Sequence, residues 1–160
     1  MSIAIEPIGY VRGGRAEPID DNWGDVEAVI ELDAAQFDPD VTAGLDAFSH
    51  LDVVYVFHLV DAAKIETRAR HPRNNTDWPL VGIFAQRAKG RPNRIGVTTC
   101  DIVAVDGLRI TVRGLDAIDG TPVVDLKPYM EEFGPRGDVC EPAWARELMK
   151  GYWQRPPFGA

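Results

Sequence analysis

Apolar and polar residues alternate in several short stretches of the chain, which is the pattern of half-buried β-strands. Residues 26–32 place Val26, Ala28, Ile30 and Leu32 at every second position and alternate with Glu27 and Glu31, so a strand with one face on the core is predicted there. Residues 51–60, LDVVYVFHLV, are almost continuously apolar and predict a central strand. Further strands are expected near the start, around Ile3, Ile5 and Ile8, and at 80–85 and 123–126, the last ended by Pro128.

Turn and helix signals complete the predicted architecture. Asp106-Gly107 separates strands predicted at 95–105 and 108–115, and this dipeptide is typical of hairpin turns in which both residues have positive φ. Helical patterns are scarce: a short turn at 43–48, and a C-terminal helix at 141–153 with Pro142 in its first turn. Strands first and one helix last favour a mainly β fold, an antiparallel β-barrel or sandwich with peripheral short helices.

Composition indicates one soluble globular domain. The 160 residues are 45% hydrophobic and 26% charged, and we expect a single domain over 1–160 with its barrel core at about 3–130. No apolar run reaches the ~18–20 residues of a membrane span, and the N-terminus lacks the pattern of a signal peptide, so a cytoplasmic protein is expected. Cys100 and Cys140 are too few for a disulfide framework, and Cys100 is expected to pack in a strand.

Charge is unevenly distributed along the chain. The formal net charge is −8, from 17 basic and 25 acidic residues. Residues 64–98 contain eight basic and two acidic residues, a net charge of +6, which leaves −14 for the rest of the chain. A basic segment in an acidic body is suited to one anionic partner at one place. The alternative is a solvated loop rich in arginine.

Several kinds of chemistry find no support in the sequence. It contains no Gly-x-Gly-x-x-Gly or Gly-Lys-Ser/Thr phosphate loop and no Gly-x-Ser-x-Gly nucleophile elbow. The histidines, His50, His58 and His71, lack the spacing of a zinc site, so no metal is expected. Two segments remain, GIFAQRAKGRPNRIG at 82–96 and DGTPVVDLKPY at 119–129, in which polar groups adjoin strand ends, where binding groups tend to lie. Both could instead be tight turns held by Arg–Asp salt bridges.

These two segments, with FSHLDVVYVFH before them and IGYVRG near the start, resemble the TsaA-like family in sequence and in order. The resemblance spans roughly Ile8 to Tyr129. It implies a β-barrel that binds S-adenosyl-L-methionine and forms a homodimer. It also implies a methyltransferase of the TrmO type, which acts on N6 of a modified adenosine adjacent to the tRNA anticodon, at position 37.

The resemblance also implies a cofactor site. The matching positions are Phe57, His58, Arg87, Val97, Asp119, Gly120, Thr121 and Pro122. Phe57 and Val97 could flank the adenine, and Arg87 could hold the carboxylate of the amino-acid tail. Asp119 could accept from ribose hydroxyls or from the ammonium group. A Pro-Arg-Gln segment of the family is replaced here by residues 17–23, EPIDDNW.

Candidate residues for the acceptor are less well defined. Asp125 and Tyr129 could orient the adenine nitrogen or accept its proton, and Arg91, Asn93, Arg94 and Lys127 could bind the tRNA substrate. Because Asp125 and Lys127 are two residues apart on one strand face, a structural ion pair is equally open. Trp144, Tyr152 and Trp153 are expected to pack the last helix on the barrel.

Two other functions stay open. One is a methyltransferase acting on a small molecule or another RNA, and the other is a non-catalytic module that binds S-adenosylmethionine. The chain departs from the family pattern in two places: Ala88-Lys89-Gly90 stands where Ser-Pro-His is usual, and Arg94 stands where Pro is usual.

Overall fold

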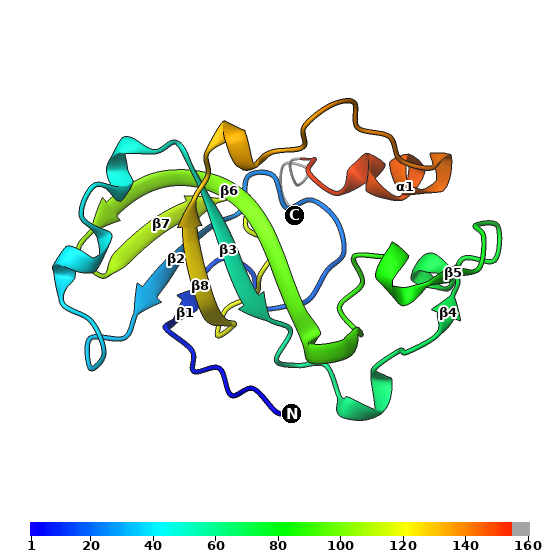
Figure 1. Ribbon diagram of the computed structural model, residues 1–160, viewed down its shortest axis with the longest axis horizontal. Coiled ribbons are helices and arrows are strands. Elements are labelled where there is room, and N and C mark those ends of the chain that lie inside the picture. The colour runs from blue at the N-terminus through cyan, green and yellow to red at the C-terminus, as the bar shows by residue number, and fades with distance from the viewer. Residues whose placement is uncertain (155–160) are drawn as a thin grey trace.

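A computed structural model describes residues 1–154 of the chain, and its centre is a closed, antiparallel β-barrel (Figure 1). The strands follow the order β1-β2-β7-β6-β3-β8, and β8 pairs with β1 to close the barrel. Their bounds are β1 Gly9–Arg12, β2 Glu27–Leu32, β3 His50–Val56, β6 Ile95–Asp106, β7 Arg109–Arg113 and β8 Pro122–Pro128. The predicted mainly β fold is confirmed as a barrel rather than a sandwich.

Alternate side chains of the strands fill the barrel. Leu51, Val53 and Tyr55 of β3 are at most 2% exposed, while the residues between them are half-buried. Cys100 of β6 lies in the same core, and its Sγ donates to the carbonyl oxygen of Leu51 at 3.6 Å. Burial raises the pKa of the Cys100 thiol to about 12, so the thiol stays protonated and serves packing, as predicted.

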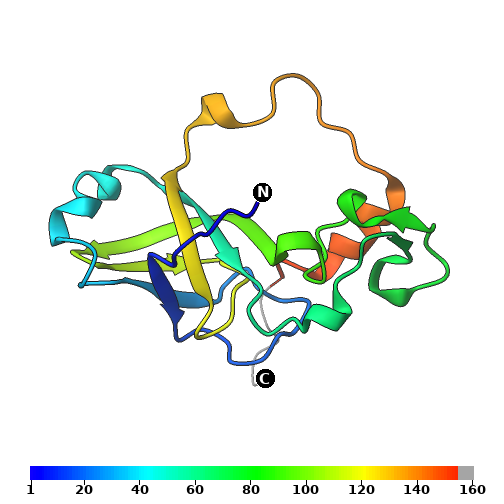
Figure 2. The same ribbon diagram turned by 60° about the horizontal axis from the view of Figure 1, so that its bottom comes forward.

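A smaller lobe lies beside one end of the barrel, and the two views agree on its place (Figures 1 and 2). It combines the hairpin of β4 (Ala69–Arg70) and β5 (Val81–Gly82) with α1 (Ala143–Leu148). The indole Nε1 of Trp78 donates to Glu147 Oε2 at 2.9 Å and joins the two parts. Short 3-10 turns occupy Pro39–Thr42, Leu45–Ala47, Ala62–Lys64, Pro72–Asn74, Ile83–Ala85, Pro92–Arg94, Glu131–Phe133 and Met149–Gly151. Within residues 1–154, no helix has both the length and the hydrophobicity to cross a bilayer.

Several element boundaries differ from the prediction. The first strand begins at Gly9, and Ile3 and Ile5 before it are exposed. The central strand ends at Val56: Phe57 N makes one more bond in the same register, to the carbonyl oxygen of Arg94 at 2.8 Å, and a turn follows in which Val60 N donates to the Phe57 carbonyl at 3.2 Å. In the 80–85 segment only Val81–Gly82 is extended, and a 3-10 turn follows.

The hairpin turn and the last helix also differ. Only Gly107 has positive φ, +55°; Asp106 is the last residue of β6, so the turn is Gly107-Leu108 instead of Asp106-Gly107. The C-terminal helix is confirmed but is shorter than 141–153, because after Leu148 it tightens into a 3-10 turn.

Candidate functional site: a cleft at one end of the barrel

A cleft of about 1590 Å³ opens at the end of the barrel where β3 ends and β6 begins. Its walls come from four places: the barrel end, residues 18–23, residues between 57 and 93, and residues 141–153. Small-ligand pockets usually measure about 300–1,000 Å³. The cleft is therefore larger than a typical pocket for one small ligand.

Aromatic rings form the part of the cleft nearest the barrel core. Tyr55 and Phe57 pack edge to face, with ring centroids 5.3 Å apart. Gly96 lies opposite Tyr55 in the ladder, and a Cβ built on it would come within 2.6 Å of the Tyr55 ring and 2.9 Å of Phe57. Glycine at position 96 therefore allows both rings to lie against the β6 backbone.

The structure brings five of the predicted cofactor residues to this cleft: Phe57, His58, Arg87, Val97 and Thr121. The Arg87 side chain donates from Nη2 to the carbonyl oxygen of Val97 at 2.5 Å, which leaves its other nitrogens for a ligand. Thr121 is 2% exposed and lines the cleft from the position directly before β8.

The rest of the predicted Asp119–Pro122 turn flanks the cleft without lining it. Asp119 is exposed and accepts from Gly13 N at 2.8 Å, so its carboxylate closes the turn against the loop after β1. A Cβ built on Gly120 would lie 4.0 Å from His58 Nε2, which places the turn next to the cleft residue His58.

Basic side chains exceed acidic ones in the lining. Arg70, Arg73, Arg87, Lys89 and Arg91 line the cleft, against Asp20, Asp116 and Glu141. Of the predicted substrate residues, Arg91 and Asn93 lie in the lining, and Arg94 does not. Arg91 donates to the Gln86 carbonyl at 2.7 Å and Arg94 to the Val60 carbonyl at 2.8 Å.

The loops around the cleft hold unusual backbone conformations. Arg73, Asn74 and Asn93 line the cleft with φ of +49°, +58° and +62°. Residues other than glycine rarely adopt positive φ, and such strain gathers at functional sites. Arg73 and Asn74 directly follow Pro72, and Asn93 directly follows Pro92.

One cleft carboxylate was missed by the sequence analysis. Asp116 accepts from the hydroxyls of Tyr55 at 3.0 Å, Thr98 and Tyr152. Burial, followed by the charge of Asp116, raises the pKa of both tyrosines, so their hydroxyls stay protonated and donate. Asp116 lies in no motif, and Tyr152 is 36 residues further along the chain, so no sequence signal joined them.

Residues 17–23, which replace the family's Pro-Arg-Gln segment, supply part of the cleft wall. Ile19, Asp20 and Trp23 are in the lining. The Arg15 guanidinium lies over the Trp23 ring at 4.5 Å and donates to the Asp21 carbonyl at 2.6 Å. This clamp fixes the loop beside the barrel.

The C-terminal segment forms the facing wall. Trp144, Tyr152 and Trp153 all line the cleft. Tyr152 anchors the segment to the barrel through Asp116, and its carbonyl accepts from Trp23 N at 2.8 Å. Trp153 is 45% exposed, so packing does not account for all three aromatic residues.

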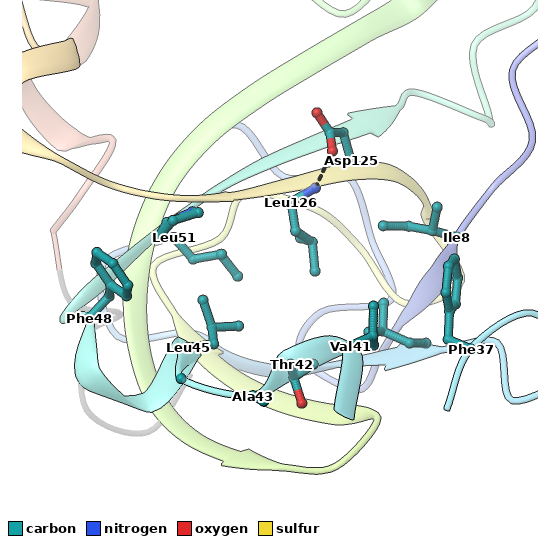
Figure 3. A pocket seen from close by; sticks show the side chains of 13 residues that line it. Ile8, Phe37, Val41, Thr42, Ala43, Leu45, Phe48, Leu51, Asp125 and Leu126 are labelled. Carbon is teal, nitrogen blue, oxygen red and sulfur yellow. Dashed lines mark hydrogen bonds between the residues drawn. The ribbon is translucent and has the colours of Figure 1, made fainter. Parts of the chain in front are cut away.

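The predicted catalytic pair does not line the cleft: Tyr129 lies at the opposite end of β3, and Asp125 lies on β8 opposite Val54 in the ladder. Asp125 borders a second cavity, of about 560 Å³, but its carboxylate turns away from the hollow (Figure 3) and pairs with Lys127. Tyr129 N donates to the His50 carbonyl at 3.0 Å, at the start of β3. Within one chain, the structure does not bring Asp125, Lys127 or Tyr129 to the cleft, and their roles stay predictions. The structure shows the Asp125–Lys127 ion pair, which the sequence analysis gave as the alternative to a catalytic role.

Comparisons with known proteins place these features in a family. The tRNA (adenine(37)-N6)-methyltransferase of Escherichia coli is 37% identical over 138 residues, which is 81% of this chain and 58% of that protein. A probable S-adenosyl-L-methionine-binding protein of Methanothermobacter thermautotrophicus is 34% identical over 141 residues, covering 86% of this chain and 97% of that protein. The human tRNA (adenine(37)-N6)-methyltransferase is 38% identical over 99 residues, covering 62% of this chain but 22% of its own length.

Solved structures and a family model agree. The crystal structure of TrmO from Pseudomonas aeruginosa matches with a TM-score of 0.70 and 26% identity, over 88% of this chain and 62% of that one. The family model "tRNA-methyltransferase O N-terminal domain" matches residues 15–134. The resemblance found in the sequence is therefore confirmed, and the chain belongs to the family of the tRNA-methyltransferase O N-terminal domain.

Proposed function

We propose that this chain binds S-adenosylmethionine in the cleft and methylates N6 of a modified adenosine at position 37, next to the tRNA anticodon. One observation carries the proposal: Phe57, Arg87 and Thr121, from separate parts of the chain, meet at a single cleft with His58 and Val97. The names of the Escherichia coli and human relatives support the acceptor.

The lining fits the parts of the cofactor. S-adenosylmethionine supplies a methyl group on a sulfonium, so the S–CH₃ bond breaks as an N–CH₃ bond forms and the acceptor nitrogen loses a proton. Phe57 and Val97 would flank the adenine, and the free nitrogens of Arg87 would bind the tail carboxylate. Positioning of two reactants can lower a barrier by roughly 7–11 kcal/mol, so the walls of the cleft would supply much of the catalysis.

Basic residues would bind the tRNA. Arg91 and Asn93 lie inside the cleft, where they would reach a nucleotide that enters it. Arg94 and Lys127 remain proposed contacts for backbone phosphates, which carry much of the affinity for nucleic acids. Asp125 and Tyr129 would act on the acceptor nitrogen only if a second copy of the chain brought them to the cleft.

We further propose a cytoplasmic homodimer with one TsaA-like domain over 1–160. Apolar side chains at the cleft support this assembly, because Phe84 is 78% exposed and Leu59 66% exposed. Asp119 is exposed and outside its own cleft, so a neighbouring chain could contact it. Sedimentation equilibrium should give twice the chain mass of 17.7 kDa; a single chain mass at micromolar concentration would contradict the dimer.

Labelling of tRNA with a tritiated methyl group tests the activity. Wild-type protein should transfer label from S-adenosylmethionine to bulk tRNA, and Arg87→Gln should transfer far less. Binding of S-adenosylmethionine without labelled RNA would instead favour a small-molecule acceptor or a non-catalytic binding module. The Methanothermobacter relative supports the non-catalytic binding module as a second candidate, because its name mentions only binding and this chain covers 97% of its length.

A further inference from the structure

Arg70, at the end of β4, has an unsatisfied donor beside the cleft. Its side chain lines the cleft, and its Nε is buried without a hydrogen-bond partner. Every other buried side-chain nitrogen or oxygen within residues 1–154 has a partner. A buried donor without an acceptor costs about 1–3 kcal/mol. The residue therefore retains a binding capacity that the chain itself does not use.

The other arginines that line the cleft differ from Arg70, because the guanidinium of each has a hydrogen-bond acceptor within the chain. Arg73 pairs with Asp21 at 2.8 Å, while Arg87 and Arg91 donate to backbone carbonyls. No ion pair joins Arg70 to a carboxylate in the part of the chain that the structure describes.

The acidic residues of the cleft are mostly engaged elsewhere. Asp116 accepts from three hydroxyls, and Glu141 pairs with Arg146 at 3.3 Å. The negative charge of Asp20 interacts with Arg73 and helps to raise the pKa of that guanidinium. Internal charges thus leave the Arg70 guanidinium without a counter-ion of its own.

The backbone at Arg70 is held rigidly. Arg70 pairs with Val81 across the hairpin, and Gln86 Nε2 donates to the carbonyl oxygens of both, at 3.0 and 2.9 Å. Gln86 is only 7% exposed, so this crosslink is protected from water. A fixed backbone with a free guanidinium is a preorganised anchor, because only the side chain must adjust on binding.

We propose that Arg70 is an oxyanion-binding residue of the cleft. Its guanidinium turns toward the cleft and binds a carboxylate or phosphate group side-on, through Nε and one Nη, which satisfies the orphan donor. Arginine suits this role because its planar fork matches two oxygens of such a group. The identity of the ligand rests on the proposed function: the oxyanion is either the tail carboxylate of S-adenosylmethionine or an anionic group of the acceptor tRNA.

Equilibrium binding to Arg70→Gln, with Arg68→Gln as the matched control, tests this. Arg68 is exposed and outside the cleft. Its backbone N–H donates to Glu66 Oε1 and its carbonyl oxygen accepts from Ile83 N, so the substitution keeps both hydrogen bonds. Thermal unfolding without ligand checks that both variants fold. The probes are S-adenosylmethionine, 5′-methylthioadenosine, which lacks the carboxylate, and bulk tRNA.

At least a tenfold loss confined to Arg70→Gln is expected for one anionic probe. Weaker binding of S-adenosylmethionine with unchanged binding of methylthioadenosine identifies the tail carboxylate, and weaker binding of tRNA alone identifies the acceptor. Arg70→Lys, which keeps the charge but not the fork, should lie between wild type and Arg70→Gln. Losses below twofold for both anionic probes would overturn the proposal.

Inorganic phosphate separates failure of this inference from failure of the proposed function. If wild-type protein binds neither S-adenosylmethionine nor tRNA, the proposed function fails. Phosphate at constant ionic strength should still raise the melting temperature of wild type and Arg68→Gln more than that of Arg70→Gln. Equal shifts in all three proteins would overturn the oxyanion site.

Discussion

A cavity lies near each end of the barrel, and the two cavities differ in chemistry. The end beyond Val56 carries the 1590 Å³ cleft with five basic side chains, whereas the end near Leu51 carries a cavity of about 560 Å³ with an apolar lining. Leu45, Leu51 and Leu126 point into that cavity, and its one charged residue, Asp125, turns outward (Figure 3).

The same strands build both ends, so the difference comes from the connections. At the Leu51 end, the link between β2 and β3 contributes apolar 3-10 turns. At the Val56 end, the long link between β3 and β6 and the C-terminal segment contribute arginines, aromatic rings and residues with positive φ. Function on a barrel of this kind is thus determined by which loops cover which end.

Substitution of Gly96 should have the largest effect, because it disturbs the cleft end at its base. The Cβ of Gly96→Ala would displace the rings of Tyr55 and Phe57. We expect the free energy of unfolding to fall by about 1–3 kcal/mol, and the affinity for S-adenosylmethionine to fall at least tenfold. Urea unfolding and calorimetric titration measure the two effects.

Gly82→Ala is the matched control, because nothing lies within 4 Å of a Cβ at Gly82 and its φ is −60°. It should change neither quantity appreciably. If Gly96→Ala behaved like Gly82→Ala, the close approach of the rings to β6 would not matter for the site.

The sequence established the strand framework but not what fills the cleft. Alternation in β2 and the apolar run of β3 were sufficient to predict these two strands, because side chains on the buried face of a strand recur every two residues. Ile3 and Ile5 show the same local pattern outside the barrel, since alternation does not reveal whether a neighbouring strand exists.

The site was predictable only where motifs carried it. Phe57, Arg87 and Thr121 were found through the resemblance, whereas Asp116, Arg70 and Trp23 were not. Their contacts depend on segments that meet only in three dimensions, such as Asp116 with Tyr152. Asp125 and Tyr129 were chosen for their chemistry, and sequence proximity to the Asp119 turn could not show that both lie outside the cleft lining.

Arg87→Gln should give the next largest effect and sharpen the comparison between the ends. A hydrogen bond to a charged group is worth about 1.5–3 kcal/mol, so the affinity for S-adenosylmethionine should fall at least tenfold. Arg109→Gln removes the same charge from an exposed position on β7 that pairs with Glu31 outside the cleft, and it should change affinity less than twofold. Equal losses would mean that net charge, not position, controls binding.

Alkaline pH should weaken the cleft end through its buried tyrosines. Because the folded pKa of Tyr152 is raised, its protonated hydroxyl stabilises the fold fully below the ordinary tyrosine pKa of about 10, and this contribution is lost as pH rises above it. Tyr152→Phe should make the decline in unfolding free energy between pH 9 and 11 shallower, by at most about 1.4 kcal/mol per pH unit. Identical slopes for variant and wild type would contradict the Asp116 network.

Asp125→Asn should have the smallest effect. The Asp125–Lys127 pair is exposed, and such pairs contribute about 0–1 kcal/mol to stability. Affinity for S-adenosylmethionine and methyl transfer to tRNA should both change less than twofold. A tenfold loss of transfer with normal cofactor binding would instead support the catalytic role predicted from the sequence, with a partner copy bringing Asp125 to the cleft.

Amide chemical-shift mapping of the labelled protein during titration with S-adenosylmethionine tests most directly which end of the barrel binds. The cleft account predicts saturable shifts at Phe57, His58, Arg87, Val97 and Thr121, and none at Leu45, Leu51 or Leu126. Shifts confined to the Leu51 end, or no shifts at millimolar cofactor, would contradict it.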